Sequence, residues 1–383
     1  MKGSDDMITY HGLRKYCSRL MALILVMVLM LTVVACSNGK SQGDATVNDT
    51  GTGSETADEG SEIAGIAPST NTDAETVTSD APVDKVKLRV GVLKGPTGMG
   101  VVQIMERREQ GDTELDYEFT IAGAPVDMAG LITSGNLDIA LLPTNMAAAL
   151  YNKTEGKVKL IHINTLGVMS IVGSDSETFA DIKDLRGKTI IAAGQGAAPE
   201  FVLNFILEQN GLDPKADVTI DFKSEHTEVA SLLLSKKNDL VLLAEPFTTS
   251  VLMQDNTNKI VFDLTGEWEK VAENNAKLVM GAAVVRTEFL AEYPEAVEIF
   301  LRDFDASQQF VNADPEAAAQ LIEKFDIFKA AVAAKAIPRS YIVSLTGAEM
   351  KGDASVFLKV LFDNNPKSIG GKLPEEDFYY LGP

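Results

Sequence analysis

The sequence contains very little cysteine. Its 383 residues include two cysteines, Cys17 and Cys36, and both lie within the first 36 residues. The remaining chain therefore has no thiol for a disulfide, a cysteine-ligated zinc site or a cysteine nucleophile. Its stability must come from a packed core, and about 300 residues are enough to build one, most simply as two lobes.

Positive charge is also scarce. Lys and Arg together number 34 against 55 Asp and Glu, which gives a formal net charge of −21. An acidic chain is a poor partner for nucleic acid and does not adsorb directly to anionic lipid. An anionic ligand is still compatible with this charge, because backbone amides at helix N-termini bind anions locally.

Histidine is rare, and the common catalytic motifs are missing. Of the three histidines, His162 lies in an apolar segment that favours a buried structural role, and His226 has no second ligand at metal spacing. Neither an HExxH zinc motif nor a GxSxG nucleophile elbow occurs. Composition alone leaves a Ser-His-Asp arrangement open, but we predict no catalytic residue, no metal and no cofactor.

The N-terminus reads as a secretory signal. A basic head at residues 14–19 precedes an apolar run of about sixteen residues, 20–35, whereas a transmembrane helix, the alternative, needs about 20. The run ends in Val-Val-Ala before Cys36, which resembles the lipobox of bacterial lipoproteins. That resemblance implies that residues 1–35 are removed and that Cys36 carries diacylglycerol. The head is long, so Met7 is an alternative start to Met1.

Residues 36–85 form a polar, acidic segment after the anchor. They contain no aromatic residue and no periodic apolar pattern, so the segment cannot bury enough surface to offset the entropy of ordering. We predict a disordered tether with a root-mean-square reach of about 40 Å.

From residue 86 the sequence repeats a strand, a short turn and a helix. Three such units lie before residue 158 and three more between 187 and 254, and mostly helical sequence follows 286. This alternation predicts an α/β fold with mainly parallel sheets. Two long apolar stretches, 158–174 and 277–289, separate the sets and predict a two-stranded hinge. Lobe one would comprise 86–172 plus 286–383, and lobe two would be 173–285 with the hinge return.

Glycine-rich turns mark the strand ends where a ligand is expected. GPTGMG (95–100) fits neither a phosphate loop, which needs GxxxxGK[ST], nor a dinucleotide fingerprint, which needs GxGxxG. Its glycines permit close approach of a ligand, and Thr97 offers a hydroxyl; a purely structural turn is the alternative. In the second set, free amides at Gly196, Ala197 and Ala198 would meet a carboxylate or sulfonate, unless the turn only caps its helix.

Polar residues follow two further strands. Thr144 and Asn145 are expected to cap a helix, either alone or while also contacting ligand. Glu245, beside a proline, would pair with an amine of the ligand or hold a loop amide. The one tryptophan, Trp268, falls on a predicted surface helix, where packing is its expected role.

Several of these features together resemble a known family. They are the lipobox, the acidic tether, GPTGMG, LPTNMAAAL (142–150), the Glu245-Pro246 pair and IPRSYIVSLTGAEM (337–350). The chain resembles substrate-binding lipoproteins of ABC importers, in the branch that binds nitrate, sulfonate, taurine and thiamine-pyrimidine precursors. The resemblance spans about residues 86–383.

The resemblance implies a two-lobe type II periplasmic-binding-protein fold whose lobes close on a small molecule by hinge bending. It implies an ABC permease and ATPase as partners, and a monomer anchored by lipid on the outer face of the bacterial cytoplasmic membrane. The ligand contacts and hinge positions that it implies are Pro96, Thr97, Gly98, Met99, Thr144, Asn145, Gln195, Gly196, Ala197 and Glu245, with the hinge at Gly167, Met169 and Gly281.

The sequence departs from that family in two respects. The turn GQGAAP of lobe two lacks the serines of sulfonate and nitrate binders, and Lys94 is the single basic residue at an evident strand end. An uncharged or zwitterionic organic ligand therefore fits as well as an oxyanion. Two other functions stay open: a lipid-anchored sensor that presents ligand to a receptor, and an enzyme on the same fold. Pyrimidine synthases of that fold carry a cysteine-rich motif, which this sequence lacks.

Overall fold

The computed structural model describes residues 85–174, 178–235 and 240–383, all within the compact unit Ser79–Pro383. The predicted signal peptide, Cys36 and nearly all of the predicted tether lie outside the described residues. Every described helix is too short or too polar to cross a bilayer.

A six-stranded sheet forms the base of lobe one, in the order β11-β4-β10-β3-β1-β2. β1, β2, β3 and β4 run parallel, and β10 and β11 run against them. The strands are β1 Lys87–Leu93, β2 Asp116–Ala122, β3 Ile139–Pro143, β4 Val158–Thr165, β10 Gly281–Arg286 and β11 Ile342–Leu345.

Helices cover both faces of this sheet, and the burial of whole strands such as β3 requires that cover. Those from the first βα set are α2 Pro96–Met99, α3 Val102–Glu109, α4 Pro125–Thr133 and α5 Thr144–Thr154. The C-terminal part adds α10 Thr287–Glu292, α11 Pro294–Ala313, α12 Pro315–Lys324, α13 Ala330–Ala336, η3 Ile337–Arg339, α14 Gly347–Asn364, η4 Pro366–Ile369 and η5 Glu376–Phe378.

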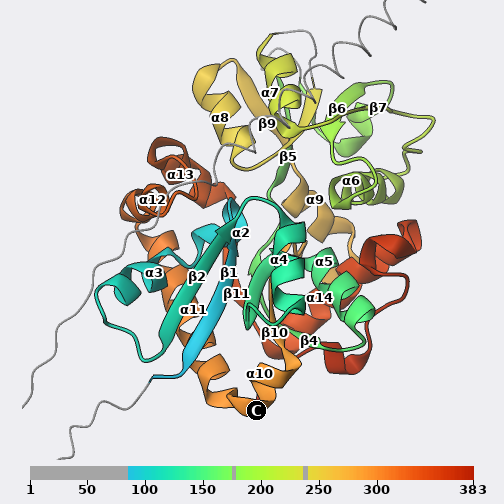
Figure 1. The fold of residues 1–383 in the computed structure, drawn as a ribbon. Helices are drawn as coiled ribbons and strands as arrows, with labels where there is room; N and C mark the ends of the chain where they lie inside the picture. Colours follow the sequence, from blue (N-terminus) through green and yellow to red (C-terminus); the bar gives the residue numbers. More distant parts are fainter. Residues whose placement is uncertain (1–84, 175–177, 236–239) are drawn as a thin grey trace, which may run out of the picture. The chain divides into compact units, whose positions relative to one another are not determined.

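Lobe two is built on a five-stranded sheet in the order β7-β6-β8-β5-β9, which Figure 1 shows above the first sheet. Its strands are β5 Met169–Ser174, β6 Thr189–Ala193, β7 Thr219–Lys223, β8 Leu240–Ala244 and β9 Asn258–Asp263. Its helices are η1 Ile182–Leu185, α6 Ala198–Gln209, α7 His226–Leu234, α8 Phe247–Gln254, α9 Leu264–Val271 and η2 Glu273–Asn275.

The chain passes between the sheets twice, once between β4 and β5 and once between η2 and β10. The apolar stretch 158–174 therefore supplies β4 to the first sheet and β5 to the second. The stretch 277–289 leads into β10 of the first sheet. The passages fall earlier than the sequence boundaries of 172 and 285: residues 169–172 belong to β5 in the second sheet, and 281–285 belong to β10 in the first. Apolar sequence continues across each passage, so it does not mark the residue where the partner strand changes.

The strand directions bring the carboxyl ends of both parallel sets toward each other. β4 ends at the first passage and is parallel to β1, β2 and β3, so these strands end on that side of lobe one. β5 starts at the same passage and is antiparallel to β8, while β6 and β7 are parallel to β8. In open α/β sheets ligands bind beyond the carboxyl ends of the strands, so this arrangement defines the candidate site.

Trp268 of α9 packs between helices of the two lobes. Its ring centroid lies 4.8 Å from that of Phe205 on α6 and 5.9 Å from that of Phe357 on α14. The side chain is fully buried, and one continuous core cluster includes it together with residues of both sheets. The packing role predicted for Trp268 is confirmed, but its face of α9 is not at the surface.

Candidate ligand-binding site

The turn after β1 is a single helical turn, α2, which contains the predicted residues Pro96, Thr97, Gly98 and Met99. Gly95, which precedes it, has φ +105°, a conformation open mainly to glycine. A Cβ added to Gly98 would lie 2.0 Å from the carbonyl oxygen of Leu93. Two of the three glycines of this turn are therefore required by the backbone, and the half-buried Thr97 hydroxyl makes no hydrogen bond to another described residue.

Gly98→Ala is expected to lower the free energy of unfolding by about 1–3 kcal/mol, because the new methyl group overlaps a backbone carbonyl. Urea unfolding at equilibrium measures the effect. Gly130→Ala is the matched control: its Cβ would meet no atom within 4 Å inside α4, so alanine should stabilise the helix by up to about 1 kcal/mol. Equal effects of the two substitutions would contradict this account of the turn.

Thr144 and Asn145 do not cap α5, which corrects the sequence prediction. α5 begins at Thr144 after Pro143, and no side chain caps its N-terminus. The Thr144 hydroxyl is buried and makes no hydrogen bond, while Asn145 Nδ2 donates to the carbonyl of Ser368, 3.3 Å away. The helix starts one residue earlier than a cap would allow, so both residues lie inside its first turn.

The turn of lobe two already contains a carboxylate. The Gly196 amide donates to Glu200 Oε2 at 2.6 Å, and the Ala197 amide donates to the carbonyl of Gly194 at 3.1 Å. The prediction of free amides at these two positions is therefore wrong in this conformation. Glu200 is the third residue of α6, and its side chain reaches back over the helix N-terminus. Gln195 is exposed beside it.

Glu245 lies at the end of β8 next to a cis peptide bond with Pro246, and its side chain is 2% exposed. Arg339 Nε lies 3.1 Å from Glu245 Oε1, and the Thr249 amide lies 3.2 Å from Oε2. Burial raises the pKa of Glu245 above its ordinary value even though Arg339 and Thr249 oppose that rise. The structure thus pairs Glu245 with a residue of lobe one, rather than leaving it free for an amine.

Arg339 is the residue near the site that sequence reasoning missed. It lies in IPRSYIVSLTGAEM (337–350), a segment that resembles the family but whose sequence gives its arginine no role. Arg339 lies 94 positions after Glu245, so no local sequence pattern indicates that the two residues pair. They meet because η3 contacts the end of β8 in the folded chain.

The predicted hinge glycines lie where the chain is tightly packed. A Cβ on Gly167, between β4 and β5, would come within 2.5 Å of Thr265 Oγ1. A Cβ on Gly281, at the start of β10, would come within 2.4 Å of Asn164 Oδ1. Met169 is buried as the first residue of β5. These positions adjoin both passages between the lobes.

The two described histidines are packed against aromatic rings. His162 is fully buried, lies 4.8 Å from Phe304 between ring centroids and pairs through Nε2 with Ser344 Oγ at 3.1 Å. Burial lowers its pKa to about 3, so the ring is neutral at physiological pH. His226 stacks on Phe247 at 5.5 Å, and burial also lowers its pKa. The predicted structural role of His162 agrees with these contacts.

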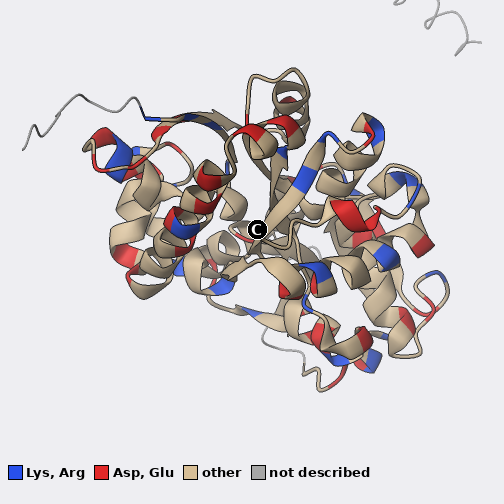
Figure 2. Ribbon diagram, turned by 90° about the horizontal axis from the view of Figure 1, so that it is seen from below, with Lys and Arg blue, Asp and Glu red and all other residues tan. Residues whose placement is uncertain are grey.

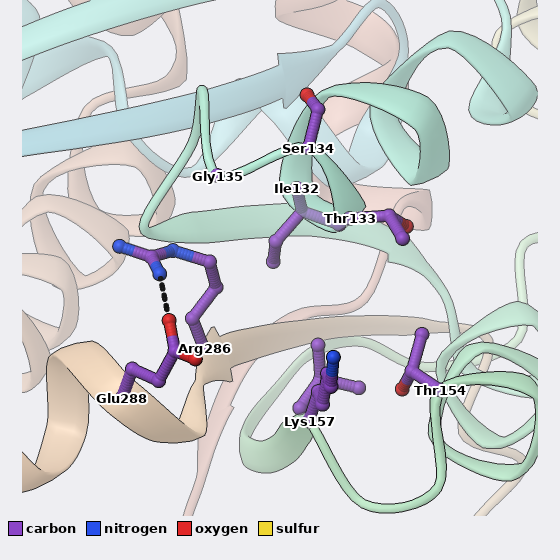
Figure 3. Close-up of a pocket in the computed structure, with 9 residues that line it drawn as sticks. Ile132, Thr133, Ser134, Gly135, Thr154, Lys157, Arg286 and Glu288 are labelled. Atoms are coloured by element: carbon purple, nitrogen blue, oxygen red, sulfur yellow. Dashed lines mark hydrogen bonds and ion pairs between the residues drawn. The ribbon is translucent and has the colours of Figure 1, made fainter.

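A separate pocket of about 160 Å³ lies at the other end of the first sheet, beside the first residue of β4, Val158, and the last residue of β10, Arg286 (Figure 3). Arg286 enters it but pairs with Glu288 and Asp138 and donates to the carbonyl of Leu137. Lys157 also lines the pocket, near the amino end of β4. The charge of Arg286 is thus neutralised by residues of the fold. The pocket lies away from the carboxyl ends of the parallel strands, where the candidate site is.

Acidic and basic residues are mixed over the described surface. Figure 2 shows Lys and Arg interspersed with Asp and Glu along the helices of both lobes, consistent with ion pairs such as Lys324 with Glu106 and Lys359 with Asp363.

The sequence matches one protein family. Residues 108–335 match the family described as "ABC transporter, phosphonate, periplasmic substrate-binding protein". A protein of Brucella abortus (strain 2308), named as a binding protein, is 25% identical over 253 residues, which cover 64% of this chain and 74% of that protein. The binding protein YtlA of Bacillus subtilis is 27% identical over 132 residues, 33% of this chain and 38% of YtlA.

Solved structures show the same fold. An ABC transporter protein of Parabacteroides distasonis superposes with a TM-score of 0.64 at 24% identity, covering 78% of this chain and 99% of that one. The periplasmic aliphatic sulphonate binding protein SsuA of Escherichia coli superposes with a TM-score of 0.63 at 14% identity, covering 78% and 92%. The two-lobe type II periplasmic-binding fold predicted from the sequence is confirmed.

Proposed function

The chain belongs to the phosphonate-type family of periplasmic substrate-binding proteins of ABC transporters, and from that premise we propose that it captures a small organic molecule between its two lobes and delivers it to an ABC permease and ATPase. The observation that carries the proposal is the meeting of two sets of parallel strand ends at the passages between the lobes. Closure of such lobes buries a ligand in a pocket of order 300–1,000 Å³.

We assign the ligand contacts to Pro96, Thr97, Gly98 and Met99 of α2, Thr144 and Asn145 of α5, and Gln195, Gly196, Ala197 and Glu245 of lobe two. Gly167, Met169 and Gly281 would accommodate the hinge motion. Of these, Thr97 and Gln195 carry polar side chains that make no hydrogen bond to another described residue, so they are the best placed to bind a ligand. Glu245 would contact the ligand while Arg339 holds its side chain in place.

The ligand we favour is uncharged or zwitterionic. Glu200 covers the N-terminus of α6, and Glu245 is buried at the next strand end of the same sheet, so lobe two presents two carboxylates. A free oxyanion would have to displace Glu200 from the Gly196 amide before it could use that helix terminus. An oxyanion ligand, such as the phosphonate after which the family is described, is the alternative.

We further propose that Cys36 carries the lipid anchor and that residues 36–85 tether the binding domain, as a monomer, outside the cytoplasmic membrane. A role as a ligand-presenting sensor would use the same fold and the same site. An enzymatic role is disfavoured, because both described histidines are packed against aromatic rings. His162 does lie 3.1 Å from Ser344 Oγ, but its ring is fully buried.

A ligand should raise the melting temperature of the chain by several degrees. A ligand at about 100 times its dissociation constant adds about 2.7 kcal/mol of stability. The panel should include taurine, alkanesulfonates, alkylphosphonates, nitrate, pyrimidines, amino acids and short carboxylates, and the fluorescence of Trp268 should change with lobe closure. An unchanged melting temperature with every neutral, zwitterionic and anionic compound would contradict the proposal that the protein is a small-molecule receptor.

For the ligand so found, Thr97→Ala and Gln195→Ala should each weaken binding by about 1–3 kcal/mol, the cost of losing a buried hydrogen bond. Titration calorimetry measures the loss. Gln209→Ala is the matched control, because Gln209 is exposed at the far end of the helix that Gln195 precedes. Unchanged affinity in both site variants would mean that the site lies elsewhere.

A further inference from the structure

The short segment Arg339–Tyr341 of lobe one makes side-chain contacts with lobe two at two places. Arg339 donates from Nε to Glu245 Oε1 at 3.1 Å and from Nη2 to Thr249 Oγ1 at 2.8 Å. The Tyr341 hydroxyl donates to Asp263 Oδ2. Glu245 follows β8 and Asp263 ends β9, so two residues of one segment reach two different strands of the second sheet.

The two contacts lie on either side of the first passage. β8 and β9 flank β5, with Met169 paired to Ala244 and Ser170 to Asp263. The amide of Leu166, just before β5, donates to the carbonyl of Tyr341 at 3.1 Å, and the amide of Glu245 donates to the carbonyl of Val168 at 2.8 Å. The segment therefore straddles the chain at the point where it enters lobe two.

The backbone of the segment is held in an unfavourable conformation. Tyr341 has φ +44°, which a residue with a bulky side chain seldom adopts. Such strain persists only where surrounding contacts enforce it, and here both its carbonyl and its hydroxyl are engaged. A tyrosine used only for packing would not need the contact of its hydroxyl with Asp263.

Opening the lobes at this point would be costly. The Glu245 side chain is 2% exposed, whereas the Arg339 side chain is 38% exposed. Moving Arg339 away would leave a buried carboxylate without its cation, and an uncompensated buried charge is strongly unfavourable. Arg339 is thus already partly in water in this arrangement, whereas Glu245 is not.

We infer that Arg339 and Tyr341 form a non-covalent clasp, a third connection between the lobes beside the two passages of the chain, which positions the Glu245 loop and sets the angle between the lobes. This inference goes beyond ligand capture, since it concerns the resting arrangement of the lobes. Arg339 and Tyr341 are thus positioning residues: they act on the site through Glu245 and Asp263.

The test is hydrogen exchange of the whole chain without ligand, for Arg339→Gln and for Tyr341→Phe, which removes only the hydroxyl. The amides of Leu166, Glu245 and Thr249 should exchange about tenfold faster or more in either variant, while β1 and β2 keep their protection. Lys94→Gln is the control, because it breaks an exposed ion pair with Asp326 inside lobe one and should leave all three amides unchanged.

Lobe movement is measured separately by the distance between spin labels at the exposed positions Val126 of α4 and Met253 of α8, in a chain whose two native cysteines are replaced by serine. The clasp predicts that the distribution of distances becomes broader and shifts to longer distances in both variants. In the Lys94→Gln control the distribution should not change. Exchange that accelerates evenly over the chain, or an unchanged distribution, overturns the inference. Neither readout needs a ligand, so failure here is distinct from failure of the receptor function.

Discussion

Replacing Asp138 with alanine is expected to lower the free energy of unfolding by about 3–5 kcal/mol, the usual cost of removing one partner from a buried ion pair. The Asp138 side chain is 2% exposed at the amino edge of the first sheet. It accepts hydrogen bonds from Arg89 at 2.6 and 2.9 Å and from Arg286 Nη2 at 2.9 Å. Without it, two partly buried guanidinium groups would face each other.

The ion pairs of Asp138 with Arg89 and Arg286 also predict that the free energy of unfolding depends on pH. Burial alone would raise the pKa of Asp138, but the hydrogen bonds from Arg89 and Arg286 outweigh that effect and hold its pKa below the ordinary value of 3.8. A carboxylate whose pKa is depressed in the folded state stabilises the fold above its unfolded pKa and loses that contribution as pH falls through the folded pKa. The difference between wild type and Asp138→Ala should therefore shrink as the pH is lowered below 3.8.

Urea unfolding at pH 7 and at pH 3 measures both effects. Asp326→Ala is the control: its side chain is 93% exposed and pairs with Lys94 at the surface, so its loss should cost less than about 1 kcal/mol. An Asp138→Ala cost within that range at pH 7 would show that the arginines are solvated without their carboxylate.

Replacing Trp268 with alanine should cost about 3–5 kcal/mol, as for other large aromatic side chains in a core. The reason is position as well as size, because Trp268 fills the space between Phe205 of lobe two and Phe357 of lobe one. Its indole nitrogen is buried without a hydrogen bond, so Trp268→Phe should cost less than the alanine variant.

Circular dichroism is the readout for these variants, because Trp268 is the only tryptophan and its removal eliminates the fluorescence signal. Leu381→Ala is the control, since that side chain is 56% exposed near the C-terminus and should change stability little. A cost for Trp268→Ala as small as that of Leu381→Ala would mean that α6 and α14 close over the cavity.

The elements of the fold follow closely from local sequence. Thr144–Thr154 forms a helix because its alanines favour helix, and Glu155 ends it in a left-handed conformation. The stretch 158–174 divides between the two sheets, as its excessive length for one strand indicated. These features depend on residues that are close together in the chain, and a single sequence shows such residues directly.

The local polar contacts at the strand ends were predicted less well. Gly196 was expected to offer a free amide, but Glu200, four residues later, occupies it. Thr144 was expected to cap α5, but the helix begins at Thr144 itself. A helix start one residue earlier than expected, or one carboxylate folding back, changes which groups remain free, and spacing alone does not decide between such alternatives.

By itself the sequence determined the α/β class and the two lobes, because periodicity and turn chemistry are local properties that burial then enforces. Its motifs also indicated the family, that of periplasmic substrate-binding proteins of ABC transporters. Only the tertiary structure decided that Glu245 pairs with Arg339, that Tyr341 reaches Asp263 and that Trp268 joins the lobes. These contacts join residues 78 to 94 positions apart in the chain. Such pairs are selected by the packing of whole layers, which no short stretch of sequence encodes.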